Sequence, residues 1–131
     1  MKKAQALQTF WESFGIPAFD ENTTPDAVPD RYITYSVATD SLGSVVNLTA
    51  SIWELNSTSW RFVEETADTI AEALESRDFS HMGIETPTIP IDGGRLFLTK
   101  GSPFAQRMSD PGSDRTRRIY LNVQAEFLTA Y

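Results

Sequence analysis

Two segments with strictly alternating apolar and polar residues most constrain the fold of this chain. In "SVVNLTASIWEL" every second residue from Val46 to Ile52 is apolar, and the residues between them are polar. "RRIYLNVQAEFL" alternates in the same way from Ile119 to Phe127. Because successive side chains of a strand point to opposite faces, both segments predict half-buried strands of an antiparallel sheet.

Two other segments carry apolar residues at the spacing of a helix. The first runs from Leu7 to Phe14 and stops at Gly15, and the second runs from Trp60 to Leu74. "IPAF" and "RYITYSVA" are typical of strands, and "TIPI-DGG-RLFLTK" predicts a hairpin whose first arm, with Pro90, is an edge strand. The expected order is α-β-β-β-α-β-β-β. The simplest packing is an α+β fold, with two helices on one face of a mainly antiparallel sheet and a polar opposite face.

The composition predicts one soluble domain covering residues 1–131. The chain is 40% hydrophobic and 22% charged, which is typical of a folded protein of this length. It contains no cysteine, which excludes disulfides and suits a reducing cytoplasm. No segment approaches the roughly 18 apolar residues that a membrane span needs, so no membrane contact is expected.

The charge is distributed unevenly along the chain. The net charge is −7, but residues 1–94 hold five Lys and Arg against fifteen Asp and Glu, whereas residues 95–131 hold six against three. The basic part is centred on "TKGSPFAQRMSDPGSDRTRR", residues 99–118, which has no apolar periodicity and several Gly and Pro residues. It is expected to be a long connection between two strands. Connections beyond about 12–15 residues are generally functional or disordered.

An acidic column is expected on the second helix. Glu64, Asp68, Glu72 and Glu75 follow at spacings of four, four and three residues, so they stack on one face. Each like-charge neighbour costs roughly 0.2–0.5 kcal/mol in an isolated helix. The column is either a solvated face that keeps the protein in solution or a surface whose repulsion a cationic partner relieves.

The basic connection and the acidic column together predict a protein interface. Phe104 and Met108 would be wasted in solvent but serve as anchors in a contact. If the basic arm of one copy reaches the acidic helix of another, the contact is head to tail and closes into a ring when the rotation permits. The residues predicted for this interface are Lys100, Phe104, Arg107, Met108, Arg115, Arg117 and Arg118 on the arm, and Glu64, Asp68, Glu72 and Glu75 on the helix. DNA contact and an ordinary loop are the alternatives for the arm.

The sequence predicts no catalytic, cofactor-binding or metal-ligating residues. His81 is the single histidine and lies in a polar connection, whereas a metal site needs clustered ligands. "DGGR" and "GSPFAQR" match no phosphate-binding loop. An enzyme stays possible only if His81 is buried beside a serine and a carboxylate.

Three segments carry a resemblance to a known family. "RYITYSVATDSLGSVVNLTASIW", "STSW" before the second helix, and "GGRLFLTKGSPFAQRMSDPGSDRTRRIYLNVQAEF" resemble small tail-terminator, or tail-completion, proteins of long-tailed bacteriophages. The resemblance covers about residues 15–127 and rests on extended similarity and element order. It implies a non-enzymatic α+β virion protein without a cofactor, assembled in the host cytoplasm as a ring, typically a hexamer, on the head-proximal end of the tail tube.

In that family the ring stops polymerisation of the tube and presents a surface to the head connector. The partners that the resemblance implies are other copies of the chain, the major tail tube protein, and a head-completion or connector protein. DNA would only pass through the acidic lumen of the ring. A head-completion or head–tail connector protein is the alternative within the same class, and a soluble nucleic-acid-binding module is the alternative from another class.

Overall fold

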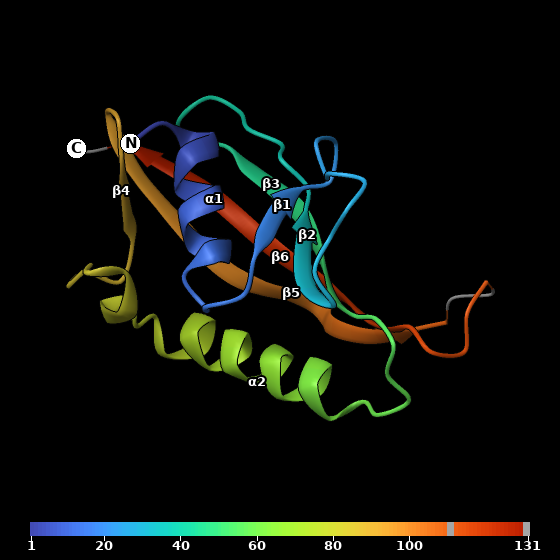
Figure 1. Cartoon of the computed structure of the whole chain (residues 1–131). Coiled ribbons are helices and arrows are strands. Elements are labelled where there is room, and N and C mark those ends of the chain that lie inside the picture. The colour runs from blue at the N-terminus through green and yellow to red at the C-terminus, as the bar shows by residue number, and fades with distance from the viewer. Residues whose placement is uncertain (110–111, 130–131) are drawn as a thin grey trace.

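The computed structural model describes residues 1–109 and 112–129 and contains one six-stranded sheet (Figure 1). The strands are β1 (Ala18–Asp20), β2 (Arg31–Tyr35), β3 (Val45–Glu54), β4 (Ile89–Ile91), β5 (Gly94–Met108) and β6 (Arg117–Thr129), in the spatial order β1-β2-β3-β6-β5-β4. All neighbouring pairs are antiparallel except β1 with β2. The long central strands are β3, β5 and β6.

Two helices cover one face of this sheet. They are α1 (Lys3–Glu12) and α2 (Arg61–Ser76), and a short 3-10 helix, η1 (Ser80–Met82), follows α2. The buried side chains of both helices join the inward-facing residues of the strands in one hydrophobic cluster. The α+β fold predicted from the sequence is therefore confirmed, with both helices on the same face (Figure 1).

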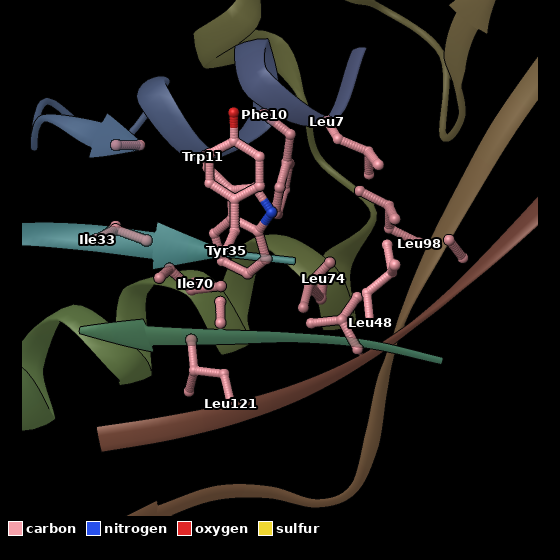
Figure 2. Packing of buried hydrophobic residues seen from close by; sticks show 14 of the residues in the cluster. Leu7, Phe10, Trp11, Ile33, Tyr35, Leu48, Ile70, Leu74, Leu98 and Leu121 are labelled. Atoms are coloured by element: carbon pink, nitrogen blue, oxygen red, sulfur yellow. The ribbon is translucent and has the colours of Figure 1, made fainter. Parts of the chain in front are cut away.

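The core is built from the two periodic patterns in the sequence. Leu7, Phe10 and Trp11 of α1 are buried, and the ring of Trp11 stacks on that of Tyr35 at the end of β2, with centroids 6.3 Å apart (Figure 2). Ile70 of α2 is fully buried beneath them. Because the alternating residues of β3 and β6 meet in register, their apolar side chains form one continuous surface for the helices.

The β4–β5 hairpin matches the expected edge of the sheet. β4 is the outermost strand, and Pro90 is exposed there, where its missing N–H removes no bond from the interior of the sheet. Gly94 begins β5 against the backbone of β6. A Cβ at this position would lie 2.0 Å from the carbonyl oxygen of Leu128, so only glycine permits this close approach.

The expectation of an irregular connection over residues 99–118 was wrong. β5 continues to Met108, and its outer half pairs with β6 from Ala105 opposite Leu121 to Met108 opposite Arg118. A bulge between Lys100 and Ala105 holds Pro103, which a regular ladder would not tolerate. Backbone pairing with β6 extends this strand although its side chains lack an apolar period.

The projecting arm is thus a two-stranded extension of the sheet. The described part of its turn, residues 109 and 112–116, lies at the right-hand extreme of the view, away from the core (Figure 1). The backbone N–H of Ser57 donates to the carbonyl of Arg115 at 2.7 Å. This contact ties the hairpin to the segment that precedes α2.

Candidate interaction surface

The acidic column and the basic hairpin come together within one chain. Lys100 forms an ion pair with Glu75, near the C-terminal end of α2. Near its N-terminal end, Nε of Arg107 donates to Oε1 of Glu64 at 2.7 Å. Lys100 and Arg107 lie on the side of the sheet that α2 covers because they pair with the inward-facing Val123 and Ile119. Four of the predicted interface charges are therefore neutralised inside the subunit.

The middle of the acidic column is left without such partners. Asp68 and Glu72 are exposed, and within residues 1–109 and 112–129 neither carboxylate has an ion-pair partner. In the same described ranges Arg115, which is exposed and precedes β6, and Arg117 and Arg118, which are half-buried at the start of β6, also have no ion-pair partner. The structure thus separates the nine predicted charges into four that form internal pairs and five without an ion-pair partner in the described ranges.

The predicted apolar anchors divide in a similar way. Phe104 is half-buried and packs against the hydrophobic core of its own subunit, with the Lys100 ammonium 5.7 Å from its ring centroid. Met108 is also half-buried, but it lies on the opposite side of the sheet, beside Arg118. An internal packing role therefore accounts for Phe104, and Met108 stays available to a partner.

Trp60 fixes the basic hairpin to the start of α2. The guanidinium carbons of Arg107 and Arg117 lie 4.7 Å and 5.3 Å from the centroid of its ring system. Nη1 of Arg117 also donates to the carbonyl oxygen of Asp114 at 3.0 Å. Cation–π contacts of this kind are worth about 0.5–1 kcal/mol at exposed sites. Trp60 therefore holds two of the predicted interface arginines on the helix side of the sheet.

The face of the sheet that the helices leave open carries an ordered row of large side chains. Tyr32 of β2, Trp53 of β3 and Arg118 of β6 are cross-strand neighbours in register. The rings of Tyr32 and Trp53 stack with centroids 5.8 Å apart and planes 7° apart. The Arg118 guanidinium lies over the Trp53 ring at 4.6 Å. We call Tyr32, Trp53 and Arg118 the open-face stack.

Hydrogen bonds hold the members of this stack in place. Nε1 of Trp53 donates to Oγ1 of Thr34 at 2.9 Å, and Nε of Arg118 donates to Oγ of Ser51 at 3.0 Å. The Arg118 guanidinium also lies 5.6 Å from the centroid of the Tyr120 ring, in the same strand. The two hydrogen bonds join residues from different strands, so they fix the rotamers of Trp53 and Arg118 across the sheet.

Sequence reasoning did not single out Tyr32, which is 8% exposed, or Trp53, which is half-buried, on the open face of the sheet. The alternation of β3 already placed Trp53 opposite its apolar face, together with Asn47, Thr49 and Ser51. That signal predicted a polar face, and most of this face is polar, with Asn122 and Gln124 at its centre. What the alternation could not supply is the register that sets Trp53 between Tyr32 and Arg118.

His81 contacts a serine, but not in the arrangement that hydrolysis requires. Oγ of Ser13 lies 2.9 Å from Nε2 of His81, and the same hydroxyl donates to the carbonyl oxygen of Phe10 at 2.5 Å. A hydroxyl has one proton, so the histidine Nε2–H is the donor to Ser13 and the serine is not activated.

The surroundings of His81 differ from those of a catalytic triad. His81 is exposed. Within residues 1–109 and 112–129 no carboxylate hydrogen-bonds to its ring. A hydrogen bond from Ser80 lowers the pKa of Asp78, and the nearby His81 contributes less to this shift. In the described residues His81 therefore lacks the buried setting and the carboxylate partner of a triad histidine.

Two further findings concern metals and membranes. Among the described residues, no group of three or more His, Asp or Glu side chains is placed to hold a metal ion. No helix in that part of the chain is long and apolar enough to cross a membrane.

In comparisons with known proteins, no family model matches the chain and no curated protein matches it.

Proposed function

We propose that this chain is a tail-terminator protein of a long-tailed bacteriophage. It assembles as a ring, typically of six copies, on the head-proximal end of the tail tube, ends tube polymerisation and forms the joint to the head connector. The extended resemblance of residues 15–127 suggests the family. The observation that carries the proposal is the separation of unpaired acids and unpaired bases onto different surfaces of one subunit.

This separation supports a head-to-tail contact between copies. Asp68 and Glu72 lie on the exposed side of α2, whereas Arg115 and Arg117 lie at the outer end of the β5–β6 hairpin. Two different surfaces that complement each other make a heterologous contact, which closes into a ring when the rotation between copies permits. Complementary charges of this kind set register and partner choice more than affinity.

The overall charge is in line with the passage of DNA through the proposed ring. A net charge of −7 fits a ring with an acidic interior, through which DNA would pass without binding. The partners are then other copies of the chain, the tail tube protein and a head-completion or connector protein. The proposed function is assembly, which involves no chemical reaction, so no cofactor is needed.

The test is assembly of the purified protein, alone and mixed with the major tail tube protein. We expect uniform rings in negative-stain images and a matching mass in sizing with light scattering. Replacing Asp68 and Glu72 by Lys should raise the dissociation constant of the subunit contact about a hundredfold or more, because like charges then meet.

The matched control replaces Glu21 and Asp26 by Lys. Both residues are exposed in the loop after β1, and the net charge changes by the same amount as in the helix variant. This control should assemble like the wild type. A wild-type protein that stays monomeric both alone and with the tube protein would contradict the proposal. Rings that bind a head connector but never the tube would identify a connector protein instead.

A further inference from the structure

We infer that Arg118, held in the open-face stack, is the receptor for the carboxylates of Asp68 and Glu72 of a second copy. This inference rests on the proposed ring and names the residue and the face that make its subunit contact. In this contact the acids meet Arg118 on the open face in place of the hairpin-tip pair Arg115 and Arg117, because neighbouring residues of β6 point to opposite sides and one acidic pair contacts only one of them. Arg117 lies against Trp60 on the helix side, and Arg118 lies on the open face.

The guanidinium of Arg118 is preorganised to bind a carboxylate. It lies 4.6 Å from the Trp53 ring and 5.6 Å from the Tyr120 ring, and Ser51 accepts the hydrogen bond from Nε. Nη1 and Nη2 make no hydrogen bond to any residue in the described ranges 1–109 and 112–129. A fixed planar guanidinium with its two terminal nitrogens free binds carboxylates through paired hydrogen bonds and loses little side-chain entropy.

The aromatic side chains of the stack favour an acidic partner over a nucleic acid. One face of the Trp53 ring is covered by Tyr32 and the other by Arg118, so the ring edges are left for a partner to contact. Aromatic edges carry partial positive charge and add to the field of the guanidinium. Nucleic-acid bases stack on open ring faces, and the two faces of Trp53 are already occupied.

A complementary acidic pair is present on the same chain. Asp68 and Glu72 are exposed, lie one helical turn apart and have no ion-pair partner in the described part of the molecule. Residues at this spacing have Cβ atoms about 5–6 Å apart, so one guanidinium reaches both carboxylates. Since α2 and the open face lie on opposite sides of the sheet, the two sites of one copy cannot meet, and each must contact another copy.

The experiment compares single variants with their mixture. Arg118→Glu and the double variant D68K/E72K should each lose assembly, because each places like charges in the contact. Mixed in equal amounts they should assemble again, since the new acid at position 118 meets the new lysines and the unchanged Arg118 meets the unchanged acids. Light scattering gives the mass of each sample, and circular dichroism melting checks that each variant is folded.

A conservative variant tests the paired geometry. Arg118→Lys keeps the charge but loses the planar pair of donors, and should raise the dissociation constant of the contact about tenfold. The matched control is Arg77→Gln, because Arg77 also lies over an aromatic ring, Phe97 at 4.6 Å, and has no ion-pair partner among the described residues. It should assemble like the wild type.

The outcomes separate this inference from the proposed function. If the wild type does not assemble, the proposed ring is wrong. If the wild type assembles and D68K/E72K does not, but both Arg118 variants assemble normally, only the inference about Arg118 is wrong. A fluorescent oligo(dT) probe that binds the wild type and not Arg118→Glu, with the assembly size unchanged, would overturn it in favour of a nucleic-acid surface.

Discussion

At the scale of single residues, burial decides the chemistry of Tyr35. Its side chain is 2% exposed and stacks on Trp11 in the centre of the core. Burial, with a smaller contribution from the nearby carboxylates of Asp20 and Glu12, raises the pKa of Tyr35 to about 12. The neutral phenol is therefore favoured in the folded protein over a wide pH range.

We expect Tyr35 to make the fold sensitive to alkali. Because the folded pKa lies above the usual value of 10, the stabilisation is complete below pH 10 and is lost as the pH rises toward about 12. Tyrosinate absorbance and denaturant unfolding, both measured across this range, check the prediction. The variant Tyr35→Phe should lose less stability over the same pH interval. If wild type and variant respond alike, the phenol of Tyr35 is not the responsible group.

At the scale of elements, ion pairs and a cation–π contact link α2 to the β5–β6 hairpin. Arg107 pairs with Glu64 and also lies over Trp60, and Lys100 pairs with Glu75 at the other end of the helix. These pairs remove like-charge repulsion at both ends of the acidic column. The basic residues of β5 therefore bind the helix that packs on the strand.

A double-mutant cycle on Glu64 and Arg107 should measure this contact. The side chains are 44% and 55% exposed, so the coupling free energy should be about 0.2–1 kcal/mol and should fall at high salt. Arg107→Ala should destabilise more than Glu64→Ala because it also removes the cation–π contact with Trp60. Urea unfolding of the four proteins gives these values.

The pair Arg61–Glu65 on the same helix is the control for this cycle. It spans one turn, is 83% and 67% exposed, and should give about 0.3–0.5 kcal/mol. A coupling of zero between Glu64 and Arg107 would mean that the internal pair does not form in solution. Both residues would then be available to a second copy, as the sequence alone predicted.

At the scale of the whole molecule, charge is arranged by surface and not by segment. The basic segment of the sequence folds so that two of its cations neutralise the helix, and the others gather at one end of the sheet. The remaining surface keeps the acidic excess of the first 94 residues. A molecule of this kind attracts acidic protein surfaces locally and repels phosphate overall.

We therefore expect that the protein does not retard duplex DNA in a gel-shift experiment at low salt. With a net charge of −7, the long-range repulsion of the phosphates exceeds the local attraction of the unpaired arginines. The same titration repeated at higher salt is the control. Retardation that is strong at low salt and disappears as salt is added would contradict the expectation and favour a nucleic-acid-binding protein.

The sequence by itself determined the α+β class, both helices and most of the strands. Those features follow from local periodicity, because the side chains from Val46 to Ile52 and from Ile119 to Phe127 record which face of each strand is buried. It also identified the charged residues of α2 and the basic hairpin. Local patterns carry this information because each element must bury one side of itself.

Only the tertiary structure decided how these residues pair. The outer half of β5 has no apolar period, and its strand exists because the backbone of β6 lies beside it. The pairing of Arg107 with Glu64, and the stack of Trp53 between Tyr32 and Arg118, join positions far apart in the sequence. Such contacts depend on strand register and helix placement, which are set when the whole core packs and not by any single segment.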